Sequence, residues 1–480
     1  MGFCWSSCNH PRHPPASSNP RPSARRNEVI LRRTRMSAVL TSDQASRTLR
    51  ARWPIWGILA VTLMLVFFQR VAPGAVADQI MAEFGISGAV FGGLTSLYFY
   101  VYALMQLPSG MLADSIGARK VVTIGGLLGA IGSLVFAAAP NLPTAYLGRF
   151  LIGLGLSVIM VNIMKLQTEW FRAREFATIS GGLVFAANCG ALLGTTPLAL
   201  LAAGVGWRPS FALIGLAGVG IALVSWVIVR NRPADLGLPS IRDVEELEHG
   251  EPPLQQPAAP RAALITTLRM VIGRKHIWPP FIAAFGFYGS FVTFAGVWGI
   301  PFLMQVYGMQ RAEAANYTLL ATLGFMAGSF TIGFQSDRIF RRRKLPFVVY
   351  GLAYALLWLA FPFWNGGRPP EAVLLPLCTA LGFFSGAQAL VAACTKEVAP
   401  PQGVGMAMGL SNIGPFLGGA LLQPLFGWAL DLRWEGLVQE GARVYPLSAF
   451  QLAFIVGSVF VAVGVLGTLL IKETYCRDLG

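Results

Sequence analysis

The sequence predicts an all-α membrane protein in which twelve transmembrane helices form two pseudo-symmetric six-helix bundles. Of its 480 residues, 54% are hydrophobic and only 12% are charged, whereas soluble domains contain about a quarter charged residues. The 54 glycines and 31 prolines also fit membrane helices, in which both are more frequent than in soluble helices. An internal repeat then divides the predicted spans into six and six.

Residues 1–53 are polar and rich in Arg, Pro and Ser. They lack the apolar core of a secretory signal peptide, so we expect a basic, disordered cytoplasmic tail. Cys4, Cys8, His10 and His13 lie close together in it, but their spacing fits no standard zinc site and no metal is predicted. An upstream translated extension, with the natural start codon at Met36, explains these residues better than a zinc site does. The sequence leaves open whether Met1 or Met36 is the true start.

Apolar stretches of about 20 residues, each long enough to cross a hydrocarbon core of about 30 Å, follow from residue 54. In the first bundle, residues 54–230, the spans are 54–76, 88–113, 120–139, 144–164, 176–200 and 209–230. In the second bundle, residues 277–472, they are 277–305, 314–335, 345–364, 372–394, 405–429 and 450–472. The polar, proline-rich residues 231–276 are predicted to be a cytoplasmic linker, and residues 473–480 a short cytoplasmic tail.

The net charge of +15 indicates an orientation in the membrane. Most Lys and Arg residues lie in the tail, the linker and alternate loops, and the loops on the other side contain only Arg208, Arg311, Arg368, Arg433 and Arg443. By the positive-inside rule, both termini are cytoplasmic in a plasma, or inner, membrane. No aromatic-interleaved basic run is present, so nucleic acid is not a predicted partner. The six scattered cysteines predict no disulfides.

One motif recurs after the second and the eighth span, as "GMLADSIGARK" and "GFQSDRIFRRR". The first copy supplies Gly110, Asp114, Gly117, Arg119 and Lys120, and the second supplies Gly333, Asp337, Arg342 and Arg343. The second copy has Phe340 where a glycine is expected. Glycine permits close helix contact and a tight turn, and the aspartate can pair with a basic residue or face a helix N-terminus. The motif is thus either a breakable latch or a solvated loop that sets topology.

This motif, in this loop of a twelve-span chain, resembles the G-x-x-x-D-x-x-G-x-R-K signature of the major facilitator superfamily. The resemblance covers residues 54–472. It implies alternating access between two bundles, with the motif holding their cytoplasmic ends together in one state. "GRFLIGLG" adds Arg149, which resembles an arginine on helix 4 of many members. "NIGPFLGG" resembles a drug-antiporter motif but falls on span eleven instead of span five, so we interpret it as a packing segment.

Arg70 ends a run of sixteen residues that contain no other charge, beginning at Pro54. At about 1.5 Å per residue it lies roughly 24 Å along the first span, past the midplane toward the outside. An arginine there costs about 2.5 to 3.5 kcal/mol, so it should face a partner or a water-filled cavity. The alternatives are a side chain that snorkels outward or an ion pair with Asp78.

The acidic residues strengthen the functional interpretation of Arg70. Every Asp and Glu of the predicted spans falls at or beyond a span end, and no histidine lies at membrane depth. Deep ionisable groups are therefore cationic, which favours an anionic or zwitterionic substrate.

Further polar side chains are candidates for the substrate site. In span two, Thr95, Tyr98, Tyr102, Gln106 and Ser109 recur at helical spacing and share one face. This stripe either lines a polar cavity or bonds neighbouring helices. The candidates from other spans are Asn162, Asn188, Tyr288, Thr293, Trp298, Gln388, Asn412 and Gln423.

An arginine on helix 1 resembles the organophosphate and sugar-phosphate exchangers, which place a second arginine on helix 7. The repeat puts Thr293 at that position, and this departure favours a single carboxylate over a phosphate. "FFQRVAPG" and "VWGIPFLMQVYGM" also resemble hexose-phosphate-type carriers and intraphagosomal amino-acid transporters.

The predicted function is secondary active transport of a small anionic or zwitterionic metabolite, a carboxylate or an amino acid, by alternating access. The carrier is predicted to be a monomer without a cofactor. No ATP-binding motif is present, so an ion or a counter-substrate would drive it. The alternatives are a drug or metabolite efflux antiporter, which normally needs a buried acidic group, and a carrier-like ligand sensor that does not transport. No catalytic cluster of side chains predicts an enzyme.

Overall fold

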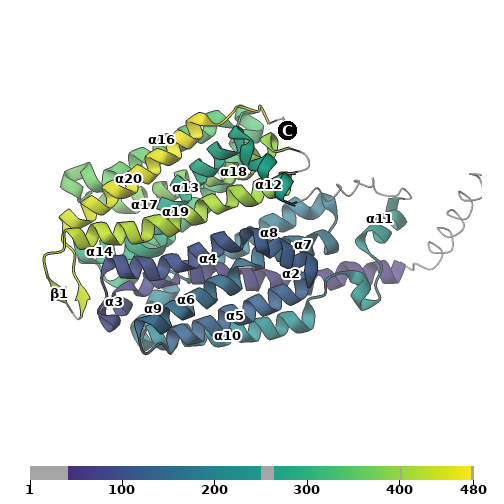
Figure 1. The fold of residues 1–480 in the computed structure, drawn as a ribbon, viewed down its shortest axis with the longest axis horizontal. Helices are drawn as coiled ribbons and strands as arrows, with labels where there is room; N and C mark the ends of the chain where they lie inside the picture. The colour runs from purple at the N-terminus through teal and green to yellow at the C-terminus, as the bar shows by residue number, and fades with distance from the viewer. Residues whose placement is uncertain (1–41, 250–263, 401–402, 440, 477–480) are drawn as a thin grey trace, which may run out of the picture.

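The computed structural model describes residues 42–249, 264–400, 403–439 and 441–476. Within these ranges, twelve helical segments are long and apolar enough to cross a membrane, which confirms the predicted number. The N-terminal six and the C-terminal six form two bundles that lie side by side along their lengths (Figure 1). Cys4, Cys8, His10, His13 and Met36 lie outside the described residues.

The N-terminal bundle begins earlier than predicted, because its first helix starts at Ser42 within the expected disordered tail. Polar residues there continue the helix beyond the apolar span. The elements of this bundle are α2 (Ser42–Val71), η1 (Ala72–Val76), α3 (Ala77–Phe84), α4 (Gly88–Ser115), α5 (Ala118–Ala137), α6 (Leu142–Ser157), α7 (Ile159–Trp170), η2 (Ala173–Glu175), α8 (Phe176–Leu193), α9 (Thr196–Val205) and α10 (Trp207–Ile228).

The linker contains three short helical segments, η3 (Pro233–Leu236), α11 (Ile241–His249) and α12 (Leu264–Gly273). The C-terminal bundle follows, and its last loop contains a hairpin that the sequence did not reveal. Its elements are η4 (Lys275–Ile277), α13 (Trp278–Thr293), η5 (Phe294–Trp298), α14 (Gly299–Tyr307), α15 (Arg311–Phe334), η6 (Gln335–Phe340), α16 (Lys344–Phe363), η7 (Trp364–Gly367), α17 (Glu371–Ser385), η8 (Gly386–Ala389), α18 (Leu390–Val398), α19 (Val404–Leu432), β1 (Val438–Gln439), β2 (Ala442–Arg443) and α20 (Leu447–Leu470).

The two ends of the molecule differ. The start of α2, the linker helices and the described C-terminus lie together at the right of Figure 1, and we call this the terminal end. The β1–β2 hairpin lies at the opposite end, which we call the hairpin end. The twelve spans found in the described residues are an even number, so the start of the first span and the end of the last lie on the same side of a membrane.

The first and seventh spans are interrupted at corresponding positions near the hairpin end. In the first span, Pro73 has no backbone N–H, so the α-helix ends at Val71 and the chain continues as the 3₁₀ turn η1. In the seventh span, the α-helix α13 changes to the π-helix η5. The two interruptions touch, because a Cβ atom on Gly74 would overlap the carbonyl group of Gly296.

At the hairpin end, α4 of one bundle packs directly on α19 of the other. Glycines allow this approach: a Cβ atom on Gly427 would overlap the carbonyl oxygen of Gly88, and one on Gly92 would overlap that of Gln423. The Asp431 carboxylate accepts hydrogen bonds from the backbone N–H groups of Gly88 (3.1 Å) and Ala89 (2.8 Å). An acidic side chain at a helix N-terminus is stabilising, so the two bundles are closed against each other at this end.

Asp78 also joins the bundles at the hairpin end, through an ion pair with Arg311. The alternative pairing of Asp78 with Arg70 is therefore wrong in this structure. The segment "NIGPFLGG" lies in α19, where Gly414 and Gly418 pack against the backbone carbonyls of Phe281 and Phe285. Its interpretation as a packing segment is confirmed.

Candidate functional site

Arg70 lies in the last turn of α2, immediately before the break at Pro73. Its side chain is buried, and Nη1 donates a 2.8 Å hydrogen bond to the hydroxyl of Tyr288 on α13 of the other bundle. Aromatic rings surround the guanidinium: its carbon lies 4.3 Å from the centre of the Phe67 ring, 5.0 Å from that of Phe416 and 5.3 Å from that of Tyr102. The Nε atom is buried without a hydrogen-bond partner.

No carboxylate among the described residues pairs with Arg70. Tyrosine hydroxyls and ring faces stabilise a cation but do not neutralise it. A buried charge without a counter-ion is strongly unfavourable, so a negative group placed beside Arg70 would be stabilised there.

A small cavity adjoins Arg70 where the two bundles meet. Its volume is about 30 Å³, which holds one or two water molecules but no metabolite. Helices of both bundles contribute to its lining: Phe67, Arg70, Val71, Asn188, Ala191, Tyr288, Phe291, Val292, Ala295, Gly296, Thr322 and Phe325. A substrate therefore needs the bundles to separate around it.

Arg149, the helix-4 arginine, supports the end of α2. It is fully buried, and its Nη1 donates a 3.2 Å hydrogen bond to the backbone carbonyl of Gln69. In an unbroken helix this carbonyl would accept from the N–H of the residue four positions later, which is Pro73 and has none. Arg149 thus replaces the missing donor at the negative end of the helix dipole. The four-residue spacing of Gln69 and Pro73 is the sequence signal that could have predicted this role, because it leaves a helix carbonyl without its usual N–H donor.

The structure brings five of the predicted site residues together at this cavity: Arg70, Tyr98, Tyr102, Asn188 and Tyr288. Tyr98 and Tyr102 lie close enough to interact electrostatically with Arg70, as does Tyr288. The ring of Tyr102 also stacks on that of Phe416 of the other bundle, with centroids 4.1 Å apart.

Gln106 and Asn412 form a separate contact between the bundles, in which the Asn412 amide donates to Gln106 Oε1 at 3.1 Å. Thr293 and Trp298 do not line the cavity. Thr293 bonds the carbonyl of Gly289 within its own helix, and the Trp298 indole donates to the carbonyl of Gln423. The Oε1 atom of Gln388 in η8 is buried without a partner.

Sequence reasoning missed the aromatic part of the site, namely Phe67, Phe291, Phe325 and Phe416. A phenylalanine in an apolar span carries no signal that separates a cavity wall from helix packing. Only their contact with Arg70 or its cavity distinguishes them.

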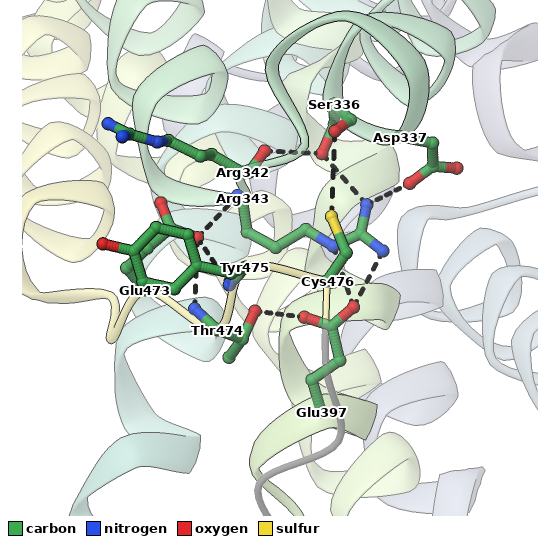
Figure 2. A network of polar contacts seen from close by, with 9 residues as sticks. All are labelled: Ser336, Asp337, Arg342, Arg343, Glu397, Glu473, Thr474, Tyr475 and Cys476. Carbon is green, nitrogen blue, oxygen red and sulfur yellow. Dashed lines mark hydrogen bonds and ion pairs between the residues drawn. The ribbon is translucent and has the colours of Figure 1, made fainter.

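The second copy of the loop motif belongs to a polar network at the terminal end (Figure 2). Arg343 forms ion pairs with Asp337 and with the buried Glu397 of α18 at 2.7 Å. Thr474, from the segment after α20, donates to the same Glu397 carboxylate. The network thus joins the loop after α15, the end of α18 and the C-terminal segment, all within the C-terminal bundle.

Glu473 belongs to the same network and accepts hydrogen bonds from the backbone N–H groups of Arg343 (2.8 Å) and Lys344 (3.0 Å). Partial burial acts to raise the pKa of Glu473, but these bonds and two more from Thr474 and Tyr475 hold it below its ordinary value. Arg342 places its guanidinium over the ring of Tyr475.

The first copy of the motif forms a turn at Gly117, whose φ of 88° favours glycine. Arg119 lies over the ring of Trp226 and donates to its carbonyl at 2.6 Å, so it contacts its own bundle. Lys120 is exposed, and the side chain of Asp114 lies outside the described part of the structure.

One expectation for the motif is wrong in this structure. Nothing lies within 4 Å of a Cβ atom built on Gly110 or on Gly333, so neither glycine supports close helix contact. In the second copy the left-handed residue is Arg341, with φ 50°, directly after Phe340. Phe340, at the position that corresponds to Gly117, does not have a positive φ.

Twelve spans in two bundles with a buried arginine between them are typical of a secondary transporter. The chain belongs to the Major Facilitator Superfamily, whose family model matches residues 58–423 and, in a second match, residues 281–475. It is therefore a membrane transporter and not an enzyme.

Similar proteins agree with this assignment. The "Probable sulfoacetate transporter SauU" of Cupriavidus necator is 22% identical, over 90% of this chain and 96% of the relative. The "Membrane sensor protein UhpC" of Salmonella typhimurium is 25% identical, over 81% of this chain and 88% of the relative. The crystal structure of a bacterial homologue of the human lysosomal transporter Spinster covers 90% of this chain and 98% of that chain at a TM-score of 0.68, with 17% identity.

Proposed function

We propose that this transporter moves a small organic anion, or a zwitterion with a carboxylate, across the plasma membrane by alternating access. The observation that carries the proposal is the buried Arg70 guanidinium between the bundles, which has no carboxylate partner among the described residues. A substrate carboxylate would supply that partner through charge-assisted hydrogen bonds. The relative named for sulfoacetate, itself an anion, supports the same substrate charge.

The asymmetric distribution of Lys and Arg supports a terminal end that faces the cytoplasm. The hairpin end would then face outward, and the state seen here would be closed to the outside by α4, α19 and the Asp78–Arg311 pair. We propose that the carrier works as a monomer. An ion or a counter-substrate drives it, and a carboxylate at a helix end or the substrate itself carries any coupled proton.

The loop motifs are proposed to act as latches at the cytoplasmic end. Arg343 supports this role, because it bridges Asp337 of one loop and Glu397 of α18, and these pairs can break and re-form. In the present state the described contacts of Arg119 and Arg343 remain within their own bundles.

Ligand-induced thermal stabilisation of the purified protein tests the proposal. Wild type and Arg70→Gln are compared against short carboxylates, amino acids, sugar phosphates, nitrate and lipophilic cations. We expect carboxylates or amino acids to stabilise wild type and to lose that effect in the variant, with little change in the melting temperature of the ligand-free protein. Stabilisation by cations, or an unchanged anion response in Arg70→Gln, contradicts the proposal.

A ligand sensor is the second candidate, because one relative is named a membrane sensor protein. A sensor and a carrier both bind the ligand, and only flux separates them. Uptake of a stabilising ligand into proteoliposomes supports the carrier, whereas binding without uptake in correctly oriented vesicles supports the sensor.

A further inference from the structure

The cavity beside Arg70 is lined mainly by rings and aliphatic groups. Its polar side chains are Arg70, Asn188, Tyr288 and Thr322. The other lining residues have hydrocarbon side chains, except Gly296, which has no side chain. Such a lining favours a ligand with one charged end and an apolar body.

Three aromatic rings of the C-terminal bundle line the cavity: Tyr288, Phe291 and Phe325. Phe291 and Phe325 stack with centroids 4.9 Å apart and planes inclined by 15°. Tyr288 meets the edge of Phe325 at 6.3 Å. Phe67 faces them from α2 of the other bundle and also lines the cavity.

The surroundings of the guanidinium restrict how an anion approaches it. Phe67 and Phe416 lie close to Arg70, with their ring centres 4.3 Å and 5.0 Å from the guanidinium carbon, so aromatic rings already cover part of the charged group. Nη1 already bonds Tyr288, and Nε is buried without a partner. A carboxylate therefore binds in the plane of the guanidinium, at its Nε edge.

A second negative group on the ligand would have no cationic side chain to pair with in this cavity. Arg70 is the one Lys or Arg among the described residues that line the cavity, and Arg149 lies outside this lining, where its Nη1 bonds the Gln69 carbonyl. A polyhydroxylated acid is also disfavoured, since its hydroxyls outnumber the polar lining groups. Each buried hydroxyl without a partner lowers affinity by roughly fivefold or more.

Two of the polar side chains that line the cavity have an oxygen atom that can still accept a hydrogen bond. The Asn188 amide nitrogen donates to the carbonyl of Val184 at 2.8 Å, which leaves its oxygen available. The Thr322 hydroxyl donates to the carbonyl of Thr318, which leaves its lone pairs available. One or two hydroxyl or amino substituents on the ligand can be bound in this way.

We propose that the substrate is an aromatic monocarboxylate, with its carboxylate on Arg70 and its ring against Phe291 and Phe325. The inference rests on the proposed transport of an anion at Arg70. It adds the chemistry of the rest of the substrate, which is its apolar part. The bundles separate to admit the ring, and the ring replaces part of the aromatic packing seen in the closed cavity.

Calorimetric binding to the full-length protein in lipid nanodiscs tests this. The probes are benzoate, 4-hydroxybenzoate, cyclohexanecarboxylate and D-glucarate. We expect benzoate to bind about fivefold more tightly than cyclohexanecarboxylate, the margin that ring stacking provides, and D-glucarate to bind most weakly. Phe325→Leu should bring the benzoate to cyclohexanecarboxylate ratio close to one. Phe330→Leu is the matched control, because Phe330 lies on the same helix and is 80% exposed.

The outcomes separate the two proposals. If benzoate and cyclohexanecarboxylate bind equally, or D-glucarate binds more tightly than benzoate, and Arg70→Gln abolishes this binding, the aromatic inference is overturned while the anion site stands. If none of the four carboxylates binds, the aromatic inference is overturned, and if they bind equally well to Arg70→Gln, both proposals are overturned. A ratio that falls equally in Phe330→Leu also overturns the inference, because the effect then does not arise at the cavity.

Discussion

At the scale of single residues, two buried arginines have different roles at the break between α2 and η1. Arg149 satisfies the carbonyl that Pro73 leaves without a donor. Arg70, one residue beyond that carbonyl, keeps its Nε without a partner. We propose that Arg149 is structural and holds the backbone at the end of α2, the helix that positions Arg70 beside the cavity.

The Arg149 role predicts a specific coupling with Pro73. Arg149→Met should leave the Gln69 carbonyl unpaired and cost about 1 to 3 kcal/mol of stability. In a Pro73→Ala background the restored N–H can bond that carbonyl, so Arg149→Met should cost at least about 1 kcal/mol less there. Thermal unfolding of the four proteins measures the cycle, with benzoate and acetate affinity as a second readout of the Arg70 position. Equal costs in the two backgrounds would show that Arg149 does not act through this carbonyl.

The sequence was sufficient to identify both arginines, because a lone charge in an apolar span is unusual. It could not identify their partners. Arg70 was predicted to face a partner or a cavity, and it does both, through Tyr288 and the adjoining cavity. Thr293 and Trp298 were equally good candidates by residue type, yet their side chains bond backbone carbonyls inside the packing.

At the scale of elements, the contact of α4 with α19 controls the hairpin end. Backbone approaches backbone at Gly88 and Gly427, and Asp431 of α19 caps α4. A side chain at Gly427 should therefore hold the two helices apart and favour the state open at this end.

Gly427→Val tests the helix contact, with Gly405→Val on the same helix as its control, because nothing lies within 4 Å of a Cβ atom at Gly405. Spin labels at the exposed Pro140 and Arg433, in a protein whose native cysteines are replaced, report the separation of the hairpin ends by electron-electron double resonance. We expect a longer mean distance in Gly427→Val and an unchanged one in Gly405→Val. An unchanged distribution in both would mean that this contact does not close the hairpin end.

The terminal-end network predicts a pH dependence for the docking of the C-terminal segment. Since the folded state holds the pKa of Glu473 below its ordinary value of 4.5, the carboxylate stabilises the fold above that pH, and the contribution is lost as pH falls through the lowered pKa. Wild type should therefore melt above Glu473→Gln at pH 6 to 7, and the gap should close as the pH falls below about 4.5. A gap that stays constant, or widens in acid, would contradict this role.

At the scale of the whole molecule, the sequence predicted the number of spans, the two bundles and their repeat. The length of an apolar stretch and a motif that recurs at the same place in each half are properties of the sequence itself, so they can be recognised without tertiary information. The helical start at Ser42, the linker helices and the β1–β2 hairpin were not predicted, because helix extension and short hairpins depend on neighbours that composition does not reveal.

The repeat also explains the position of the proposed substrate site. Corresponding interruptions in the first and seventh spans bring Gly74 against Gly296, with Arg70 and Tyr288 on either side of the boundary between bundles. Movement of one bundle against the other changes the surroundings of Arg70 while each bundle keeps its own packing. This arrangement is suited to alternating access.

Uptake into proteoliposomes tests the central claim, that Arg70 binds a transported carboxylate, most directly. Wild type, Arg70→Gln and Gly405→Val would be reconstituted at equal protein density, and radiolabelled 4-hydroxybenzoate and D-glucarate would be supplied in parallel with an imposed proton gradient or an internal counter-substrate. We expect saturable uptake of at least one carboxylate by wild type and the control, and a loss of at least about 100-fold in Arg70→Gln, consistent with losing a buried charge-assisted contact. Uptake that persists in Arg70→Gln, with each protein equally folded, would contradict the claim.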